Sequence, residues 1–266
     1  QKSFLGRKLQ ERHWKFMKSF IDKITDSRKI LLIFLASELI NFLTLLVSNY
    51  VNPLADLYKF GVGSWGILRV YGNFDGYHYW NIAVNGYGLY QEAFFPLYPV
   101  IIRISGIFTN SHFINGLIIS NLSFLLFLLF LFKFLRDLIG EKNALWAIFL
   151  LALFPTSFFF VSYYASSTFF LFFSLYLYLL TNKKYLFSGI FGYFSALTRF
   201  IGLFAVIPAF IYLFSERKNI TFNKLVVILG PILGFLTYSL FLFKTKGDFY
   251  FLLAHSQILA QIGRPI

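Results

Sequence analysis

The sequence predicts an all-α fold, a polytopic transmembrane helical bundle of about seven membrane helices, two of them short, with a large first external loop. Three observations predict this class. Hydrophobic residues make up 58% of the 266 residues, charged residues only 13%, and the apolar residues form long runs. Soluble domains are about half apolar, so the additional apolar surface is expected to face lipid. The chain has no cysteine, which excludes disulfides and thiolate chemistry.

The basic residues are concentrated in particular segments. The net charge is +13, but nine of the 24 Lys and Arg residues precede Ile30, and most of the others lie in short gaps between apolar runs. This is the bias of a membrane protein whose basic segments stay in the cytoplasm, and it excludes a nucleic-acid partner. Residues 1–29 are therefore expected to form a basic cytoplasmic segment on the membrane lipids, followed by a transmembrane domain at residues 30–266. The expected location is a prokaryotic cell membrane, or the endoplasmic reticulum membrane in a eukaryote.

Long apolar runs define the predicted spans, since a helix needs about 20 apolar residues to cross a core of about 30 Å. Residues 145–180 are apolar for 36 residues, about 54 Å as one helix, which is too long for one crossing. Basic residues flank both ends, so we expect a hairpin with its turn near residues 162–167. The other predictions are spans at 30–50, 113–135 and 225–243, an external loop at 51–112, and a short interfacial helix within that loop at 94–108.

Residues 186–214 carry one charge, Arg199, close to their centre. A simple span would leave this arginine at mid-bilayer, where an unpaired charge costs at least ~2.5 kcal/mol. We therefore expect two half-helices that meet near residues 198–202 and lift Arg199 to an outward-facing polar cavity. There it either binds an anion, or it holds the broken helix by pairing with Glu38 of the first span or with backbone carbonyls.

The external loop contains Asp75, followed by a short helix-like run dense in aromatic residues at 77–80. Aromatic rings stack on sugar faces, and a carboxylate can accept a hydroxyl proton. The alternative is that Asp75 caps the helix and the aromatic residues form an interfacial belt. Taken alone, these residues favour the alternative.

The same loop resembles the PIG-V-like family of GT-C membrane glycosyltransferases, which includes the second mannosyltransferase of glycosylphosphatidylinositol assembly and its prokaryotic relatives. That family has an aromatic-Asp pair after the first span, then an Ile-Ala…Gly-Tyr segment, then Ala-Phe-Phe-Pro-x-x-Pro. The resemblance extends over residues 71–257. The matching residues, in the family's order, are Phe74-Asp75, Ile82-Ala83, Gly86-Tyr87, residues 93–99, 153–156 and 196–199, and Gly247-Asp248 before His255 and Gln257.

The resemblance implies an inverting transfer of a sugar, expected to be mannose, on the outer or lumenal side of the membrane. The donor would be a polyprenyl- or dolichyl-phosphate sugar, and the acceptor a glycan or glycolipid. Asp75 would be the catalytic base and Arg199 the ligand of the donor phosphate. The chain has no Asp-x-Asp and no His pair at helical spacing, so no cofactor and no required metal are expected. Further candidates for substrate binding are His78, Glu92, Tyr98 and His255.

Two positions depart from the family pattern. Asn73 replaces the usual Arg of Arg-Trp-Asp, and Ser166 stands where the family has Glu at the turn of the hairpin. Family members also continue for further spans, so we expect this chain to be a C-terminally truncated piece. These departures leave the acceptor and the activity open. His78 either contacts substrate or is structural, and Glu92 either orients the acceptor or is solvated.

Two other functional classes stay open at this stage. A transporter or lipid flippase would also use intramembrane charge and broken helices, but it predicts polar residues in several spans and repeat symmetry, and neither is evident here. A non-catalytic membrane subunit, with a partner subunit, is the third class, and Ser166 is the residue that favours it.

Overall fold

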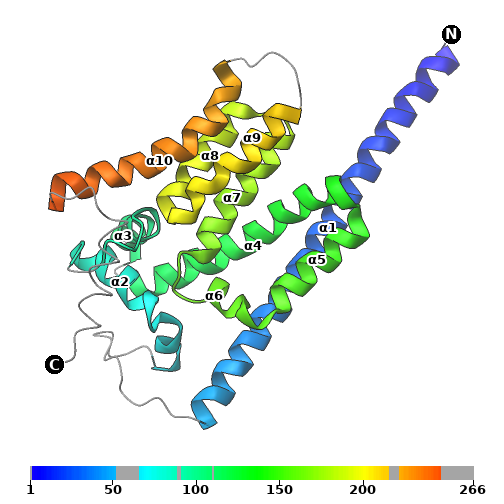
Figure 1. Cartoon of the computed structure of the whole chain (residues 1–266). Helices are drawn as coiled ribbons and strands as arrows, with labels where there is room; N and C mark the ends of the chain where they lie inside the picture. Colours follow the sequence, from blue (N-terminus) through cyan, green and yellow to red (C-terminus); the bar gives the residue numbers. More distant parts are fainter. Residues whose placement is uncertain (1, 52–65, 89–90, 110, 216–221, 247–266) are drawn as a thin grey trace, which may run out of the picture.

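The computed structural model describes residues 2–51, 66–88, 91–109, 111–215 and 222–246, with side chains described within residues 26–51, 66–88, 91–109, 111–214 and 224–245. All regular structure in these ranges is helical, which confirms the predicted all-α class. The elements, most of them labelled in Figure 1, are α1 (Lys2–Val51), the 3-10 helix η1 (Gly66–Gly72), α2 (Asp75–Asn85), α3 (Leu97–Thr109), α4 (His112–Ile139), α5 (Glu141–Leu153), η2 (Pro155–Ser157), α6 (Phe158–Val161), α7 (Ser166–Thr181), α8 (Tyr185–Thr198), η3 (Phe200–Ala205), α9 (Val206–Ser215) and α10 (Phe222–Lys246).

Three helical stretches are long and apolar enough to cross a membrane. They are Asp26–Val51 of α1, His112–Ile139 (α4) and Lys224–Thr245 of α10. A fourth is added if α5 and the η2–α6 segment, bent by 71° at a short break, form one broken span. The described residues therefore fit a multi-pass membrane protein with three or four full-length spans. The total of about seven membrane helices stays a prediction.

The two predicted interruptions of long apolar runs are present. The run at 145–180 folds as α5, η2 and α6, then a turn at residues 162–165, then α7. The run at 186–214 is interrupted at Arg199, which follows α8 and precedes η3. Both breaks lie close to Asp75, the first residue of α2, and together they form the site described below.

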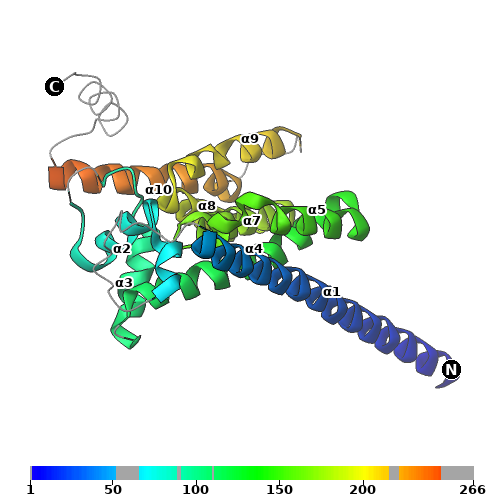
Figure 2. The ribbon, with the colours of Figure 1, turned by 90° about the horizontal axis from the view of Figure 1, so that it is seen from below.

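The long helices pack in a row. α10 packs on α8, α8 on α7, α7 on α4, and α4 on α5 and α1. The short helices α2 and α3 pack on α4, beside the end of the long helices at which α4 begins (Figure 1). Seen from below, the N-terminal part of α1 extends away from the other helices (Figure 2). Buried side chains of α4, among them Phe124, Phe127 and Phe132, fill the core that α4 shares with α1 and α5.

Charged residues gather where the middle of α1 lies beside the C-terminal end of α4 and the start of α5. Arg136 Nη1 lies 3.6 Å from Asp26 Oδ2. Lys29 Nζ lies 2.9 Å from Glu141 Oε1 and 3.7 Å from Asp26 Oδ1. These ion pairs mark one boundary of the apolar part of the bundle, as expected where helices leave the hydrocarbon core.

Glycines permit the close approach of α8 and α10. A Cβ atom placed on Gly230 of α10 would collide with the carbonyl of Gly189 on α8, and one on Gly189 would collide with the carbonyl of Val226. Membrane helices commonly meet through small residues, because close backbone contact gives the van der Waals attraction that holds them together in lipid.

We predict that Gly230→Ala destabilises the protein, because the added methyl group has no space and α10 must move away from α8. Overpacking of this kind costs about 1–3 kcal/mol. The midpoint of thermal unfolding in detergent measures the effect. Leu233→Ala is the control on the same helix, because that side chain is 52% exposed and its truncation should change the midpoint little. Equal midpoints for Gly230→Ala and the wild type would contradict the close packing.

Candidate active site between α2 and the α8–η3 break

A cavity of about 490 Å³ lies between α2, α7 and the break that follows α8. Asp75 and Arg199 both line it, although they are far apart in the sequence. The structure therefore brings together the predicted base and the predicted phosphate ligand. The remaining lining residues are mostly aromatic or small: Tyr79, Ala93, Phe94, Phe169, Phe170, Thr198, Phe200 and Ile201.

Asp75 is the first residue of α2 and is exposed to the cavity. The capping position itself belongs to Phe74, whose side chain makes no capping hydrogen bond. The interpretation of Asp75 as the N-cap is therefore wrong. The helix dipole stabilises a carboxylate in the first turn by about 0.3–1 kcal/mol. Asp75 therefore gains stability at this position although its oxygens make no capping hydrogen bond.

The backbone immediately before Asp75 is strained. Phe74 has φ 55° and ψ −121°, a conformation that residues with a Cβ atom rarely adopt. Strain of this kind costs about 1–3 kcal/mol and persists only where surrounding contacts impose it, commonly at functional sites. The imposing contacts here come from the turn before α7. The Tyr163 N–H donates to the Tyr71 carbonyl at 2.8 Å, and the Tyr164 hydroxyl donates to the Asn73 carbonyl at 2.9 Å.

Arg199 ends α8 in an extended conformation, with φ −152° and ψ 147°. Its carbonyl accepts a hydrogen bond from the Gly202 N–H at 2.9 Å. Gly202 lies so close to the last turn of α8 that a Cβ atom there would collide with the Ser195 carbonyl. The chain therefore folds back tightly at this point, which turns Arg199 out of the helix and into the cavity.

The guanidinium of Arg199 is held by Ser166. Arg199 Nη1 donates to Ser166 Oγ at 2.7 Å. Glu38 lines a different cavity, against α4 and η1, so the proposed pairing of Arg199 with Glu38 is wrong. Ser166, which stands where the PIG-V-like family pattern has Glu, thus contacts Arg199 directly. Because a hydroxyl carries no charge, this contact does not neutralise the positive charge of Arg199.

Tyr79 lies one helical turn after Asp75 on the same face of α2. Its ring packs edge-on against Phe94 and Tyr98, with centroids 5.1 and 5.2 Å apart. Burial raises the pKa of the Tyr79 hydroxyl, Arg199 opposes this rise, and Asp75 adds to it. The hydroxyl therefore stays protonated and can donate a hydrogen bond beside both charged residues.

His78 takes part in the network that holds the loop after α2. Gln91 Oε1 accepts hydrogen bonds from the Gly88 N–H at 2.8 Å and from Asn81 Nδ2 at 3.3 Å. Gln91 Nε2 must then be the donor to His78 Nδ1, at 3.3 Å. Accepting through Nδ1 requires a neutral imidazole with its proton on Nε2. Burial lowers the pKa of His78, against the opposing effect of Asp75, which agrees with the neutral form.

The other predicted substrate ligands lie elsewhere. Tyr98 is fully buried, and its hydroxyl contacts the Gly116 carbonyl at 3.1 Å and Ser120 Oγ at 2.7 Å. Its hydroxyl therefore holds α3 to α4 and is not free to bind substrate. Glu92 does not line the cavity, but its carbonyl accepts a hydrogen bond from the Tyr238 hydroxyl at 2.9 Å, which ties this loop to α10. His255, together with Gly247-Asp248 and Gln257, lies outside the described residues.

Sequence reasoning missed the part that Tyr79, Tyr164 and Gln91 play in the site, and it named Ser166 without its contact to Arg199. Tyr79 could have been found from its spacing of four residues after Asp75, which places both on one helical face. The contacts of Tyr164, Ser166 and Gln91 depend on tertiary folding, and no local pattern predicts them. In the part of the chain that the structure describes, no three His, Cys, Asp or Glu side chains are grouped to hold a metal ion.

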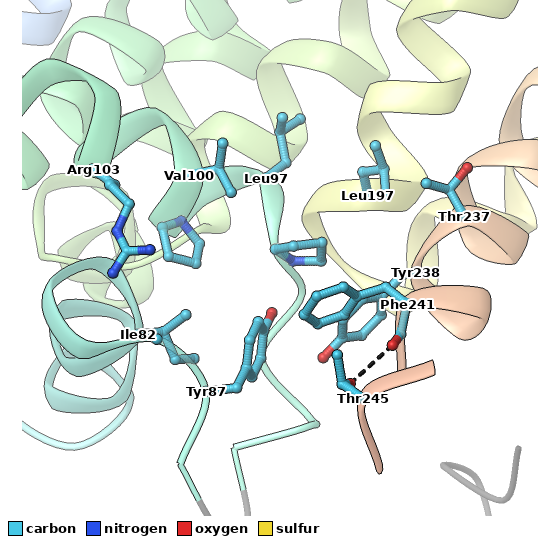
Figure 3. Close-up of a pocket in the computed structure, with 13 residues that line it drawn as sticks. Ile82, Tyr87, Leu97, Val100, Arg103, Leu197, Thr237, Tyr238, Phe241 and Thr245 are labelled. Carbon is cyan, nitrogen blue, oxygen red and sulfur yellow. Dashed lines mark hydrogen bonds between the residues drawn. The ribbon is translucent and has the colours of Figure 1, made fainter. Parts of the chain in front are cut away.

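A larger cavity of about 630 Å³ lies on the other side of the segment at residues 93–97, between α3 and α10 (Figure 3). Its wall is almost entirely apolar or aromatic, and the rings of Tyr87 and Tyr238 lie side by side in it, with centroids 6.0 Å apart. Arg103 lies at its edge, where its Nε and Nη2 donate to the Ala83 and Val84 carbonyls near the end of α2. Neither Asp75 nor Arg199 lines this cavity, whereas the adjacent residues Leu197 and Thr198 line one cavity each.

Comparisons with protein-family models, with curated proteins and with solved structures found no match for this chain. The geometry of the site and the sequence motifs are therefore the basis for assigning a function.

We predict that His78 makes the folded state lose stability in mild acid. The pKa of His78 is below its usual value of about 6.5 in the folded state. As the pH falls through about 6.5, the unfolded chain binds a proton before the folded protein does, which favours unfolding. The stability difference between the wild type and His78→Gln should therefore shrink from pH 7.5 to pH 5.5. Thermal unfolding midpoints at both pH values measure it, and a difference that is constant or grows in acid would contradict the neutral, buried histidine.

Proposed function

We propose that this protein is an integral membrane glycosyltransferase. In this proposal it transfers a sugar, expected to be mannose, from a polyprenyl- or dolichyl-phosphate donor to a glycan or glycolipid acceptor. The observation that carries the proposal is the presence of Asp75 and Arg199 in one aromatic-walled cavity. Its volume of about 490 Å³ lies within the range of about 300–1,000 Å³ found for pockets that hold small ligands. The resemblance of the motifs to the PIG-V-like family supports the same assignment.

The chemical step is a single displacement with inversion. Asp75 takes the proton of the acceptor hydroxyl while that oxygen forms a bond to the anomeric carbon. The bond from the anomeric carbon to the phosphate oxygen breaks, and the lipid phosphate leaves with the electron pair. Arg199 stabilises the charge that develops on the phosphate. General-base catalysis of this kind contributes about 10²–10⁴-fold to the rate.

The contact between Arg199 and Ser166 is compatible with this role. Bidentate binding of a phosphate requires a guanidinium whose charge is not already neutralised by a carboxylate. Ser166 fixes Arg199 through one hydrogen bond at Nη1 and brings no opposing charge. The remaining N–H groups of the guanidinium are then available to the donor phosphate.

In this proposal the lipid chain of the donor lies in the apolar cavity between α3 and α10. It begins beside Leu197, next to the cavity that contains Arg199. A donor whose phosphate lies on Arg199 would then extend its first isoprene units along the rings of Tyr87, Tyr238 and Phe241. A water-soluble nucleotide sugar has no long apolar chain to bury, so it would gain little binding free energy from these apolar and aromatic side chains.

The proposed topology follows the charge bias of the sequence. The N-terminus lies in the cytoplasm, the Asp75 end of the bundle lies on the outer or lumenal side, and the complete membrane domain is GT-C-like, with about seven membrane helices. The non-catalytic subunit is the alternative class. It predicts that purified protein with a polyprenyl-phosphate sugar and a glycolipid acceptor yields no product until a partner is added.

We predict that Asp75→Asn lowers the transfer rate at least about a hundredfold, because the amide cannot take the acceptor proton. Asn has nearly the size of Asp, so insertion, folding and donor binding should be unchanged. The assay follows radiolabelled polyprenyl-phosphate mannose in membranes that contain the full-length protein, at saturating donor. Asp137→Asn is the matched control, because Asp137 lies near the C-terminal end of α4 and does not line the cavity. This variant should keep full activity. Near-normal turnover by Asp75→Asn would contradict the assignment of Asp75 as the catalytic base.

We predict that Arg199→Lys weakens the use of the donor about tenfold or more, because lysine keeps the charge but loses the planar fork that binds two phosphate oxygens. The loss should appear in kcat/KM for the lipid-phosphate donor. Arg136→Lys is the control, since Arg136 pairs with Asp26 away from the site. Wild-type kcat/KM in Arg199→Lys would show that the guanidinium does not bind the phosphate bidentately.

A further inference from the structure

The Tyr79 side chain carries a polar group that the protein itself leaves unused. Tyr79 lines the cavity that contains Asp75 and Arg199, and only 5% of the residue is exposed. Its hydroxyl makes no hydrogen bond with any residue that the structure describes. The unpaired hydroxyls of Ser167 and Ser195 are covered completely by neighbouring atoms, but the Tyr79 hydroxyl is not. A ligand in the cavity can therefore reach it.

Other buried tyrosines of the described residues use their hydroxyl groups within the fold. Five of them donate to a backbone carbonyl: Tyr98, Tyr163, Tyr164, Tyr176 and Tyr238. A phenylalanine in place of Tyr79 would fill the same space without burying an unpaired polar group, which is unfavourable for folding. The Tyr79 hydroxyl therefore indicates a hydrogen-bond partner that comes from outside the chain.

The packing of the Tyr79 ring fixes the position of its hydroxyl. The ring meets Phe94 and Tyr98 edge-on, with centroids 5.1 and 5.2 Å apart. Phe94 is itself stacked on His78, with centroids 4.6 Å apart, and the Tyr98 hydroxyl is bonded to α4. Because the ring is already held, a ligand that binds the hydroxyl does not have to immobilise the side chain. This lowers the entropy cost of binding.

The charges around the hydroxyl favour an anionic acceptor. Burial raises the pKa of Tyr79, and among the charged residues Arg199 has the largest effect, which lowers this pKa. Asp75 has a smaller effect in the opposite sense. The positive charge of Arg199 therefore dominates at the hydroxyl. A ligand atom near both groups is stabilised most if it is an anionic oxygen, because hydrogen bonds to charged acceptors are about twice as strong as those between neutral groups.

We propose that the Tyr79 hydroxyl binds the phosphate of the lipid-linked sugar, by donating a hydrogen bond to an oxygen of the group that Arg199 holds. This inference rests on the proposed transferase function and adds a second residue that binds the donor phosphate. Tyr79 keeps its proton throughout, and Asp75 takes the proton of the acceptor. Since the phosphate gains negative charge as its bond to the sugar breaks, the hydrogen bond strengthens during transfer and stabilises the leaving group.

Thermal unfolding of the ligand-free protein in detergent tests the unpaired state of the hydroxyl. Tyr79→Phe should not lower the unfolding midpoint, because the hydroxyl has no partner to lose. Tyr98→Phe, which loses the contacts to Gly116 and Ser120, should lower it. A decrease for Tyr79→Phe as large as that for Tyr98→Phe would show that the hydroxyl is held within the protein, and would overturn the proposal.

The binding test uses radiolabelled polyprenyl phosphate, which carries no sugar, and the purified full chain in detergent. Tyr79→Phe should weaken the binding about tenfold or more, because a hydrogen bond to a charged group is lost. Tyr77→Phe is the matched control, because it removes a hydroxyl from the same helix at a residue that does not line the cavity. This variant should bind like the wild type.

The outcomes separate this inference from the proposed function. If the wild type binds polyprenyl phosphate and Tyr79→Phe binds it equally well, the inference is wrong and the proposed function stands. If the wild type does not bind polyprenyl phosphate at all, both are contradicted. Polyprenyl-phosphate mannose is the second ligand. If Tyr79→Phe weakens the binding of this ligand but not that of polyprenyl phosphate, the hydroxyl contacts the sugar, and its assignment to the phosphate is overturned.

Discussion

The turn between α6 and α7 is the constraint on which the candidate site depends. On one side, Tyr163 and Tyr164 hold the backbone carbonyls of Tyr71 and Asn73, which imposes the strained conformation that precedes Asp75. On the other side, Ser166 holds the guanidinium of Arg199. The turn is itself fixed to α4, because Ser120 Oγ donates to the carbonyl of Tyr164. Since a packed core transmits small displacements, a shift of this turn would move both charged residues at once.

The parts of the fold that could be predicted from the sequence follow from local properties. The apolar run that contains Arg199 predicted a helix break, because a lone arginine is costly in the middle of a span, and the structure breaks there. The run at 145–180 was too long for one crossing, and it turns at 162–165. The pairing of Arg199 with Glu38 was wrong for a tertiary reason. The two residues line different cavities, Glu38 beside α4 and η1 and Arg199 beside α2 and α7. No sequence pattern reports which helices are neighbours.

The residues of the candidate site also divide into those that the sequence identified and those whose role depends on tertiary packing. Arg199 was identified from its position as the one charge in an apolar run, and Asp75 from the resemblance of its motif, because its residue type and position alone favoured a helix cap. The structure places both at one cavity. Tyr98 was assigned from its motif, but its hydroxyl lies in the core, against the Gly116 carbonyl and Ser120. A tyrosine in an aromatic motif can face the cavity or the core, and only helix packing decides between them. The neutral form of His78 likewise depends on Gln91, whose contacts arise from the folding of the loop.

The most direct measurement of the central claim is thiol cross-linking across the cavity. The chain has no cysteine, so Ala93→Cys with Phe200→Cys introduces one defined pair at two positions that line it. A short bifunctional thiol reagent should join this pair, and a polyprenyl-phosphate sugar should protect it. A control pair of Ala93→Cys with Trp146→Cys, which is exposed on α5, should not be joined. Failure of the cavity pair to cross-link in folded protein would contradict the shared cavity. Cross-linking that the lipid-phosphate sugar does not slow would contradict its assignment as the donor site.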